Sequence, residues 1–322
     1  MSANYSRSTF LAAAGALGAI GIAPRSRVFA ATPVSVAYAG SLVTLMERSV
    51  GPAFDATGYA FEGEAKGSTA LANLIKSGLR TPDVFISADT AAVDSLRGAS
   101  GNDSAKWYAT FAATRMQIAY SDKSKFAADF RAAAAGKLPV PDLLTRPGIA
   151  IARTDPAQDP KGYRVLLVMD LAEKFYKKPG LASAVLGDQE NAKQVLPEES
   201  ALTRLESGEI DALWAYSLES VSRHLPVVEL PTQINLGDPS HANEYASASV
   251  SVNGKTYRGA PIVFALTIPT NAKDAAAGAA FVAFFLGPKG TALQTAAGLT
   301  KLTPVVTGDR DAIPETLRAT FS

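Results

Sequence analysis

Residues 34–42 read Val34-Ser35-Val36-Ala37-Tyr38-Ala39-Gly40-Ser41-Leu42, a short apolar run followed by a Gly-Ser step. A second Gly-Ser step, Gly67-Ser68, precedes another run with helical spacing. In each copy the pattern predicts a strand and then a helix whose N-cap is the serine. The first N–H groups of a helix have no partner within it, and they carry about half a positive charge. Two such helix starts that face one point form a cradle for a small oxyanion.

The composition of the chain excludes several classes of binding partner and of metal site. The chain has 322 residues, which is long enough for two domains of ordinary size. Its formal net charge of +1 gives no general attraction to nucleic acid or to a membrane surface. Because cysteine is absent, disulfides, thiolate nucleophiles and cysteine-ligated zinc are excluded. Histidine occurs only at His224 and His241, which excludes a histidine-rich metal site.

Residues 1–30 have the features of an export signal. Arg7 precedes an apolar, Ala/Gly-rich run over residues 10–23, and small residues allow cleavage near Ala30. Residues 6–11 resemble a twin-arginine signal with one arginine missing, so the twin-arginine and general secretory routes both stay open. The alternative is an uncleaved anchor helix, although the apolar run is shorter than the ~20 residues that cross a membrane. We therefore expect a periplasmic protein.

Strands and helices alternate from Pro33 onward, a pattern typical of βαβ units with a parallel sheet. Asn253-Gly254, within the alternating residues 248–257, predicts a hairpin. The other strands are expected at 34–39, 59–61, 83–87, 116–120, 148–153, 210–216, 227–230 and 261–269, and the helices at 41–50, 68–76, 163–177, 198–207 and, broken at Gly287-Pro288, 272–297.

The order of these elements predicts an α/β protein with two lobes and a ligand cleft between them. We place the crossings between the lobes near residues 111–115 and 231–237, where a hinge would close the cleft. One lobe then comprises residues 31–113 and 238–322, and the other comprises residues 114–237.

Four positions that follow strands or open helices are candidates for the cleft: Ser41, Ser68, Asp155 and Glu219. Each has an ordinary explanation too, because serine and aspartate cap helices and a loop glutamate is usually solvated. Two carboxylates would repel sulfate or phosphate. They are favourable beside a hard, high-valent metal centre that accepts further oxygen ligands, as in molybdate and tungstate. If they face the cleft, Asp155 and Glu219 therefore distinguish between these ligands.

Several short stretches together carry a family resemblance: Tyr38-Ala39-Gly40-Ser41-Leu42, residues 61–68 and 83–89, Arg153-Thr154-Asp155-Pro156, residues 159–163, Leu230-Pro231, Ile234-Asn235-Leu236, Pro261-Ile262-Val263 and Thr267-Ile268-Pro269. Through them the chain resembles the archaeal-type molybdate/tungstate-binding proteins of ABC importers, a branch of the periplasmic binding protein type II fold. The resemblance covers nearly all of residues 33–307.

The resemblance implies that the two Gly-Ser steps hydrogen-bond the oxyanion and that two carboxylates complete six-fold coordination of its metal. The ligand-binding residues it implies are Gly40, Ser41, Ser68, Asp155, the N–H group of Ala157 and Glu219, with Asp155 and Glu219 as ligands of molybdenum or tungsten. Ser217 is a rival for the position of Glu219, because the spacing of this stretch differs from that of archaeal members. Lys66 and Arg153 either offset the added negative charge or are solvated surface charges.

We therefore expect an extracytoplasmic substrate-binding protein, not an enzyme, that captures tungstate or molybdate for an ABC importer. It is expected to act as a monomer, with a permease and an ATPase as partners, no nucleic acid, and no cofactor besides the bound ligand. The alternatives are a binder of another small oxyanion, such as sulfate or thiosulfate, and an exported hydrolase that uses the cleft carboxylates as acid and base. The sequence contains no Gly-x-Ser-x-Gly elbow, His-Glu-x-x-His pair or phosphate loop, which lowers the expectation of an enzyme.

Overall fold

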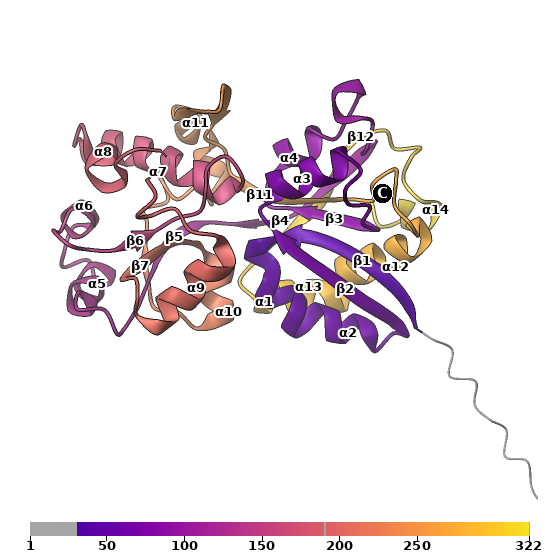
Figure 1. The fold of residues 1–322 in the computed structure, drawn as a ribbon, viewed down its shortest axis with the longest axis horizontal. Helices are drawn as coiled ribbons and strands as arrows, with labels where there is room; N and C mark the ends of the chain where they lie inside the picture. Colours follow the sequence, from indigo (N-terminus) through magenta and orange to yellow (C-terminus); the bar gives the residue numbers. More distant parts are fainter. Residues whose placement is uncertain (1–30, 190, 322) are drawn as a thin grey trace, which may run out of the picture. The chain divides into compact units, whose positions relative to one another are not determined.

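The computed structural model of the chain describes residues 31–189 and 191–321. The export signal predicted at residues 1–30 lies outside the described residues. From Ala31 the chain forms one compact unit. Within the described residues its strands form a six-stranded sheet, a four-stranded sheet and a two-stranded hairpin, and helices cover the two larger sheets (Figure 1). The predicted α/β class is confirmed.

The six-stranded sheet combines parallel and antiparallel strands, whereas the sequence pattern predicted a parallel one. Strand β1 pairs in parallel with both β2 and β3, but β11 runs antiparallel to β3 and β4, and β12 runs antiparallel to β4. The spatial order is β12 (Thr300–Gly308), β4 (Trp107–Thr114), β11 (Ile262–Thr267), β3 (Val84–Ser87), β1 (Thr32–Ala39) and β2 (Tyr59–Lys66). We call this sheet and its helices lobe 1.

Side chains that alternate along the strands hold helices on both faces of the lobe 1 sheet. On one face, Ala37 and Phe85 pack with Leu71 and Val93 of helices α3 (Ser68–Lys76) and α4 (Thr90–Asp94). On the other face, Val36 and Ile86 belong to the main core, beside helices α2 (Gly51–Asp55), α12 (Ala275–Leu286) and α13 (Pro288–Ala296). Figure 1 shows these two helix groups above and below the sheet. The short α14 (Glu315–Arg318) and η3 (Ala99–Gly101) complete the lobe.

The four-stranded sheet has the order β6 (Ile151–Ala152), β7 (Ala212–Tyr216), β5 (Met116–Tyr120) and β8 (Val227–Glu229). Its helices, which complete lobe 2, are α5 (Ala127–Ala134), α6 (Val140–Leu144), α7 (Pro160–Tyr176), α8 (Leu181–Leu186), α9 (Glu198–Ser207) and α10 (Ser217–Arg223). Helix α9 covers one face of the sheet through Leu202 and Leu205, and α7 packs against β7 from the other side. The chain changes sheet at Arg115, between β4 and β5. The predicted lobe boundaries stay a prediction.

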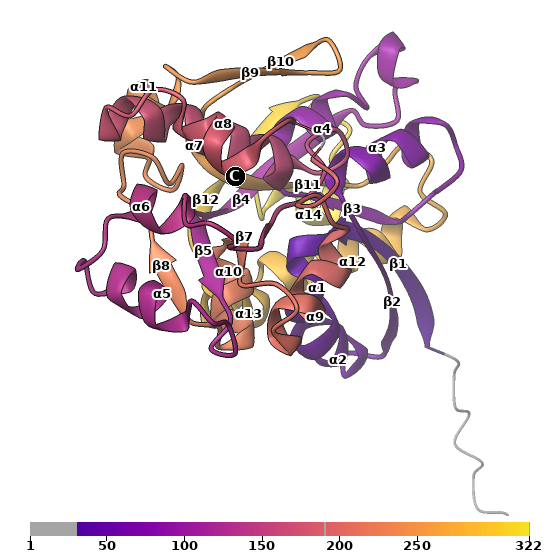
Figure 2. The ribbon, with the colours of Figure 1, turned by 60° about the vertical axis from the view of Figure 1, so that its left-hand side comes forward.

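The hairpin predicted at Asn253-Gly254 is confirmed, because both residues have the positive φ that a type I′ turn requires. Its strands are β9 (Ser249–Val252) and β10 (Lys255–Arg258), which are antiparallel. They follow η4 (Pro239–His241) and α11 (Ala242–Tyr245). The hairpin lies over α7 (Figure 2), where the rings of Tyr163 and Tyr257 stack with their centroids 4.0 Å apart.

The helix predicted at residues 41–50 is longer than expected. It begins at Gly40 and continues without a break through η1 (Gly40–Leu42), α1 (Val43–Leu45), a π-turn η2 (Met46–Val50) and α2, to Asp55. The predicted end at Val50, just before Gly51-Pro52, is therefore wrong. The wider π-turn shifts the backbone hydrogen bonds just before Pro52, so that the missing N–H of the proline is tolerated.

The helices were compared with the length and apolar composition that a membrane-spanning helix needs. Within the described residues no single helix is long and apolar enough to cross a membrane, and only α12 and α13, bent by 59° at Gly287, pass a test of length and composition as a pair.

Candidate functional site

The two predicted helix starts share one backbone geometry. The residue before each helix, Ala39 or Gly67, has φ −54° and ψ 133°, and no side chain in the described part of the chain caps either start. The expectation that Ser41 and Ser68 are N-caps is therefore wrong, because each helix begins earlier than its serine requires. Capping consequently does not explain why these serines are present.

The hydroxyl groups of both serines are buried. Ser68 is fully buried, and its Oγ accepts a hydrogen bond from the N–H of Ala88 at 3.0 Å. Ser41 is 4% exposed, and its Oγ has no hydrogen-bond partner among residues 31–189 and 191–321. A buried hydroxyl without a partner costs free energy of about 1–3 kcal/mol. Such a group is expected where a ligand supplies the missing partner.

Asp155 lies in a turn that helix α7 supports. Its Oδ1 accepts the N–H of Ala157 at 2.8 Å, so the two residues that the resemblance pairs are joined directly. Gly162 in the first turn of α7 lets the helix pack under this turn, because a Cβ there would lie 2.6 Å from backbone atoms of Thr154, Asp155 and Pro156. Asp155 does not cap the helix. That role belongs to Asp159, whose Oδ1 accepts the N–H of Lys161 at 2.7 Å with Pro160 in the first turn.

The Asp155 turn faces the start of helix α3 across the cleft. Ala70 donates its N–H to the carbonyl oxygen of Gln158 at 3.4 Å. A Cβ at Gly67 would lie 3.1 Å from the carbonyl carbon of Gln158. A cavity of about 380 Å³ lies here, lined by Lys66, Gly67, Ala70, Thr154, Asp155, Gln158, Asp159, Val195, Leu196, Pro197, Glu198 and Glu199. The structure therefore brings Asp155 and Ala157 close to the second Gly-Ser step.

Glu219 is placed differently from our expectation of a loop residue. It lies in the first turn of α10, with its Oε2 accepting the N–H of Tyr216 at 2.6 Å and its Oε1 2.7 Å from Nζ of Lys161. Both carboxylate oxygens are thus engaged within lobe 2, and Glu219 does not line the cavity. The rival, Ser217, is also buried, and its Oγ lies 2.9 Å from Oγ1 of Thr114. The roles of Glu219 and Ser217 in ligand binding stay predictions.

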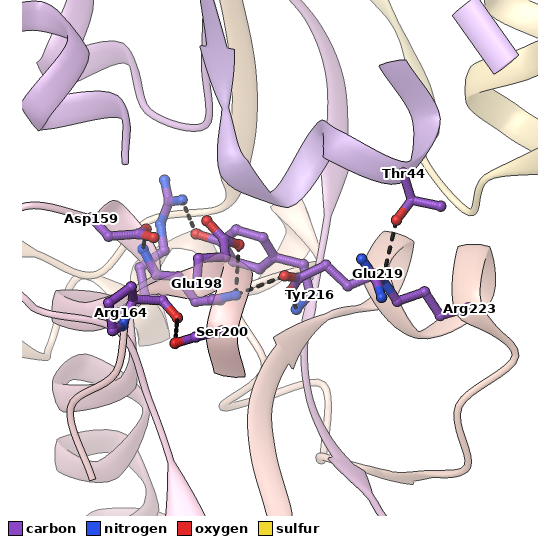
Figure 3. A network of polar contacts seen from close by, with 10 residues as sticks. Thr44, Asp159, Arg164, Glu198, Ser200, Tyr216, Glu219 and Arg223 are labelled. Atoms are coloured by element: carbon purple, nitrogen blue, oxygen red, sulfur yellow. Dashed lines mark hydrogen bonds and ion pairs between the residues drawn. The ribbon is translucent and has the colours of Figure 1, made fainter. Parts of the chain in front are cut away.

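Behind the cavity lies a buried cluster of charged groups that sequence reasoning missed (Figure 3). Nζ of Lys161 lies 2.7 Å from both Oε1 of Glu198 and Oε1 of Glu219. Lys161 is fully buried, and both glutamates are nearly so. Arg164, one turn further along α7, donates to Tyr216 Oη and to the carbonyl oxygen of Ala88, each at 2.6 Å. The cluster therefore links helices α7, α9 and α10 and touches lobe 1.

The carboxyl groups of this cluster have pKa values shifted in different directions, so they differ in protonation state at neutral pH. Burial, with the charge of Glu198 nearby, raises the pKa of Glu219 to about 8 and raises that of Asp159 well above its usual value. Burial also opposes ionisation of Glu198, but the Lys161 ammonium and hydrogen bonds from its neighbours keep the pKa of Glu198 below its usual value. At neutral pH, Glu198 is therefore the ionised partner of Lys161.

The raised pKa of Glu219 predicts a pH-dependent stability. Between pH 4.5 and about 8, folded Glu219 keeps its proton while the unfolded carboxyl has lost it, so raising the pH through this window favours unfolding. We expect the melting temperature of wild type to fall more steeply between pH 5 and pH 8 than that of Glu219→Gln, whose amide oxygen can still accept the Tyr216 N–H. Thermal melts across this range measure the difference. Equal slopes for the two proteins would contradict the assignment.

The two basic residues expected near the ligand differ in burial. Lys66 is exposed and lines the cavity. Arg153 is fully buried rather than solvated, and it donates to the carbonyl oxygen of Asp188 at 2.8 Å. Its Nη1 has no hydrogen-bond partner within the described residues. Burial lowers the pKa of Arg153.

Comparison with known proteins identifies the family of the chain. The sequence model of the bacterial extracellular solute-binding protein family matches residues 34–300. The chain belongs to this family. The solute-binding protein is 36% identical over 297 residues to a putative ABC transporter molybdenum-binding protein of Haloferax volcanii, covering 88% of this chain and 91% of the relative.

A second relative and a solved structure are also similar to the chain. The solute-binding protein is 28% identical over 251 residues to the molybdate/tungstate-binding protein WtpA of Thermococcus kodakarensis, covering 71% of this chain and 69% of the relative. Its fold is similar to that of the periplasmic molybdate-binding protein of Azotobacter vinelandii, with a TM-score of 0.53, 19% identity, and coverage of 83% of this chain and 98% of the other. The fold expected from the resemblance, a periplasmic binding protein with two lobes, is confirmed.

Proposed function

We propose that this solute-binding protein captures molybdate or tungstate outside the cytoplasm and delivers it to an ABC importer. The observation that carries the proposal is a pair of helix starts that no side chain of residues 31–189 or 191–321 caps. Each has a buried serine, and the hydroxyl of Ser41 has no partner in that part of the chain. A tetrahedral oxyanion supplies acceptors for those hydroxyl and N–H groups. The names of the relatives in Haloferax and Thermococcus support the choice of oxyanion.

In this proposal the ligand is held by Gly40, Ser41, Ser68 and Asp155, and by the N–H of Ala157, which donates to Oδ1 of Asp155 until the ligand binds. Asp155 faces the cavity, and its carboxylate favours an ion whose centre accepts an additional oxygen ligand. A sulfate binder is the second candidate function, because the helix starts alone do not distinguish tetrahedral anions. Asp155 argues against it, since a carboxylate beside sulfate is repulsive.

The partners and location follow from the same proposal. We infer that residues 1–30 direct export and are removed near Ala30, and that the protein acts in the periplasm as a monomer. A permease and an ATPase would receive the oxyanion. Closure would be a hinge motion of the lobes at residues 111–115 and 231–237.

The test is calorimetric titration of the purified protein with tungstate, molybdate and sulfate in turn. We expect one-to-one binding of tungstate or molybdate and no heat from sulfate. Sulfate binding of similar affinity would favour the second candidate, and the absence of binding to any of the three would overturn the proposal. Turnover of phosphate or sugar esters would instead reveal a hydrolase.

Replacing Asp155 with Ala is expected to weaken tungstate binding roughly 10- to 100-fold, the usual loss for one charge-assisted contact. Sulfate binding should not weaken, because the repulsive carboxylate is gone. The matched control is Asp188→Ala: Asp188 is an exposed residue of lobe 2 whose side chain does not line the cavity. Full tungstate affinity in Asp155→Ala would exclude a role for this carboxylate.

A further inference from the structure

Glu198 belongs to lobe 2 but reaches the backbone of lobe 1. It occupies the first turn of α9, and a Cβ added at Gly40 would lie 3.0 Å from its Cδ and closer still to its Oε2. Only 5% of its side chain is exposed. The residue after Gly40 is Ser41, whose buried hydroxyl has no partner among the described residues. The first helix start therefore combines a buried unpaired donor with a carboxylate from the opposite lobe.

This carboxylate is fixed in place by Lys161. Nζ of Lys161 holds Oε1 of Glu198 at 2.7 Å, which leaves Oε2 as the oxygen directed at Gly40. Glu198 also lines the cavity, together with Asp155 of the facing turn. The two carboxylates thus come from different segments of lobe 2 and border one space.

An oxyanion held by the Gly40-Ser41 step would lie beside this carboxylate, because the carboxylate of Glu198 borders Gly40. For sulfate or phosphate the contact joins two negative charges in a buried place, which is strongly unfavourable. For molybdate or tungstate the metal has empty orbitals that accept oxygen lone pairs. The same side chain therefore repels one class of anion and binds the other.

We propose that Glu198 is a ligand of the bound metal and the residue that excludes sulfate, with Asp155 as the second carboxylate. This inference rests on the proposed function. Each carboxylate donates one oxygen lone pair to the metal, so that two dative bonds form while no metal–oxo bond breaks and no electron or proton is transferred. The coordination of the metal rises from four to six oxygens.

The geometry favours Glu198 over Glu219 in this role. Glu219 uses one oxygen for the Tyr216 N–H and the other for Lys161. Glu198 directs Oε1 at Lys161 and Oε2 at the first Gly-Ser step, and its further hydrogen bonds are with the side chains of Asp159 and Glu219. Ligation by Glu198 therefore breaks no hydrogen bond of the helix cap.

The experiment compares wild type with Glu198→Gln by calorimetric titration with tungstate and with sulfate. We expect Glu198→Gln to bind tungstate roughly 10- to 100-fold more weakly and to bind sulfate at least as well as wild type. The matched control is Glu209→Gln, which removes the same charge from an exposed residue of lobe 2 that does not line the cavity. The control should keep the wild-type affinities.

A second variant guards against misfolding of Glu198→Gln. Gly40→Ala keeps the charge and its pairing with Lys161 but places a Cβ where the carboxylate lies, so it should also weaken tungstate binding. Wild-type tungstate affinity in Glu198→Gln, with sulfate still rejected, would overturn the assignment while leaving the proposed function intact. Failure of wild type to bind either metal oxyanion would overturn both.

X-ray absorption at the tungsten edge gives a readout that a merely structural role does not affect. Bound tungstate should be six-coordinate in wild type and in Glu209→Gln, and should lose one oxygen ligand in Glu198→Gln. An unchanged spectrum in Glu198→Gln would show that this carboxylate is not a ligand.

Discussion

Replacing Lys161 with Met is expected to lower the free energy of unfolding by about 3–5 kcal/mol, the cost of leaving a buried charge without its partner. The ammonium of Lys161 is fully buried and lies 2.7 Å from carboxylate oxygens of both Glu198 and Glu219. Without it, Glu198 must either stay ionised in a buried site or take up a proton. Because protonation relieves the charge, the loss should be smaller at pH 5 than at pH 8. Urea unfolding at the two pH values measures it.

The control for this prediction is Lys178→Met. Lys178 forms an ion pair with Asp142 at 2.6 Å, but both side chains are 49% exposed. Exposed pairs of this kind contribute about 0–1 kcal/mol. A similar small loss for Lys161→Met would mean that the buried cluster does not depend on its lysine.

Replacing Gly67 with Ala is expected to weaken tungstate binding about 5- to 150-fold, which corresponds to a cost of ~1–3 kcal/mol for overpacking a close contact. The added Cβ would lie 3.1 Å from the carbonyl carbon of Gln158 and 3.4 Å from Cα of Asp159, and closer still to the Gln158 oxygen. The atoms it meets are backbone, which cannot turn aside as a side chain can. The Asp155 turn would consequently be held away from the second helix start.

The same variant should leave the free energy of unfolding nearly unchanged, because a small separation of the lobes relieves the close contact of the added Cβ. Gly67 has φ −54° and ψ 133°, a conformation that alanine adopts without strain. Calorimetry and thermal melting of one preparation therefore separate the two effects. Wild-type affinity in Gly67→Ala would show that this close approach of the lobes is not needed for capture.

The local pattern of the sequence was sufficient for several elements of the fold, but not for strands β4 and β12 of the lobe 1 sheet. Helix α3 lies at the residues predicted for it, and the predicted turn at Asn253-Gly254 joins β9 to β10. These features depend on neighbours in the chain, and residue type reports them directly. The antiparallel direction of β11 and the continuation of the first helix past Pro52 depend on tertiary packing and on a π-turn, which no short pattern indicates.

The candidate site was only partly predictable for the same reason. Ser41, Ser68 and Asp155 were predicted as candidates because Gly-Ser and Thr-Asp-Pro steps stand out beside strands. Glu198 was seen only as the first residue of a helix, and Lys161 only as part of a stretch of family resemblance. Lys161 and Glu198 come into contact beside Gly40 only when the fold brings α7, α9 and Gly40 together from distant parts of the chain. One signal was present in the sequence, since Lys161 stands just before the long apolar part of α7.

The most direct test of the central claim is the position of tungsten in crystals of the protein grown with tungstate, located by its anomalous scattering. We predict one strong peak between the two Gly-Ser steps, with the hydroxyl of Ser41 within hydrogen-bonding distance of a bound oxygen and with Asp155 and Glu198 as ligands of the metal. A peak elsewhere on the molecule, or no peak in crystals that contain tungstate, would contradict the account.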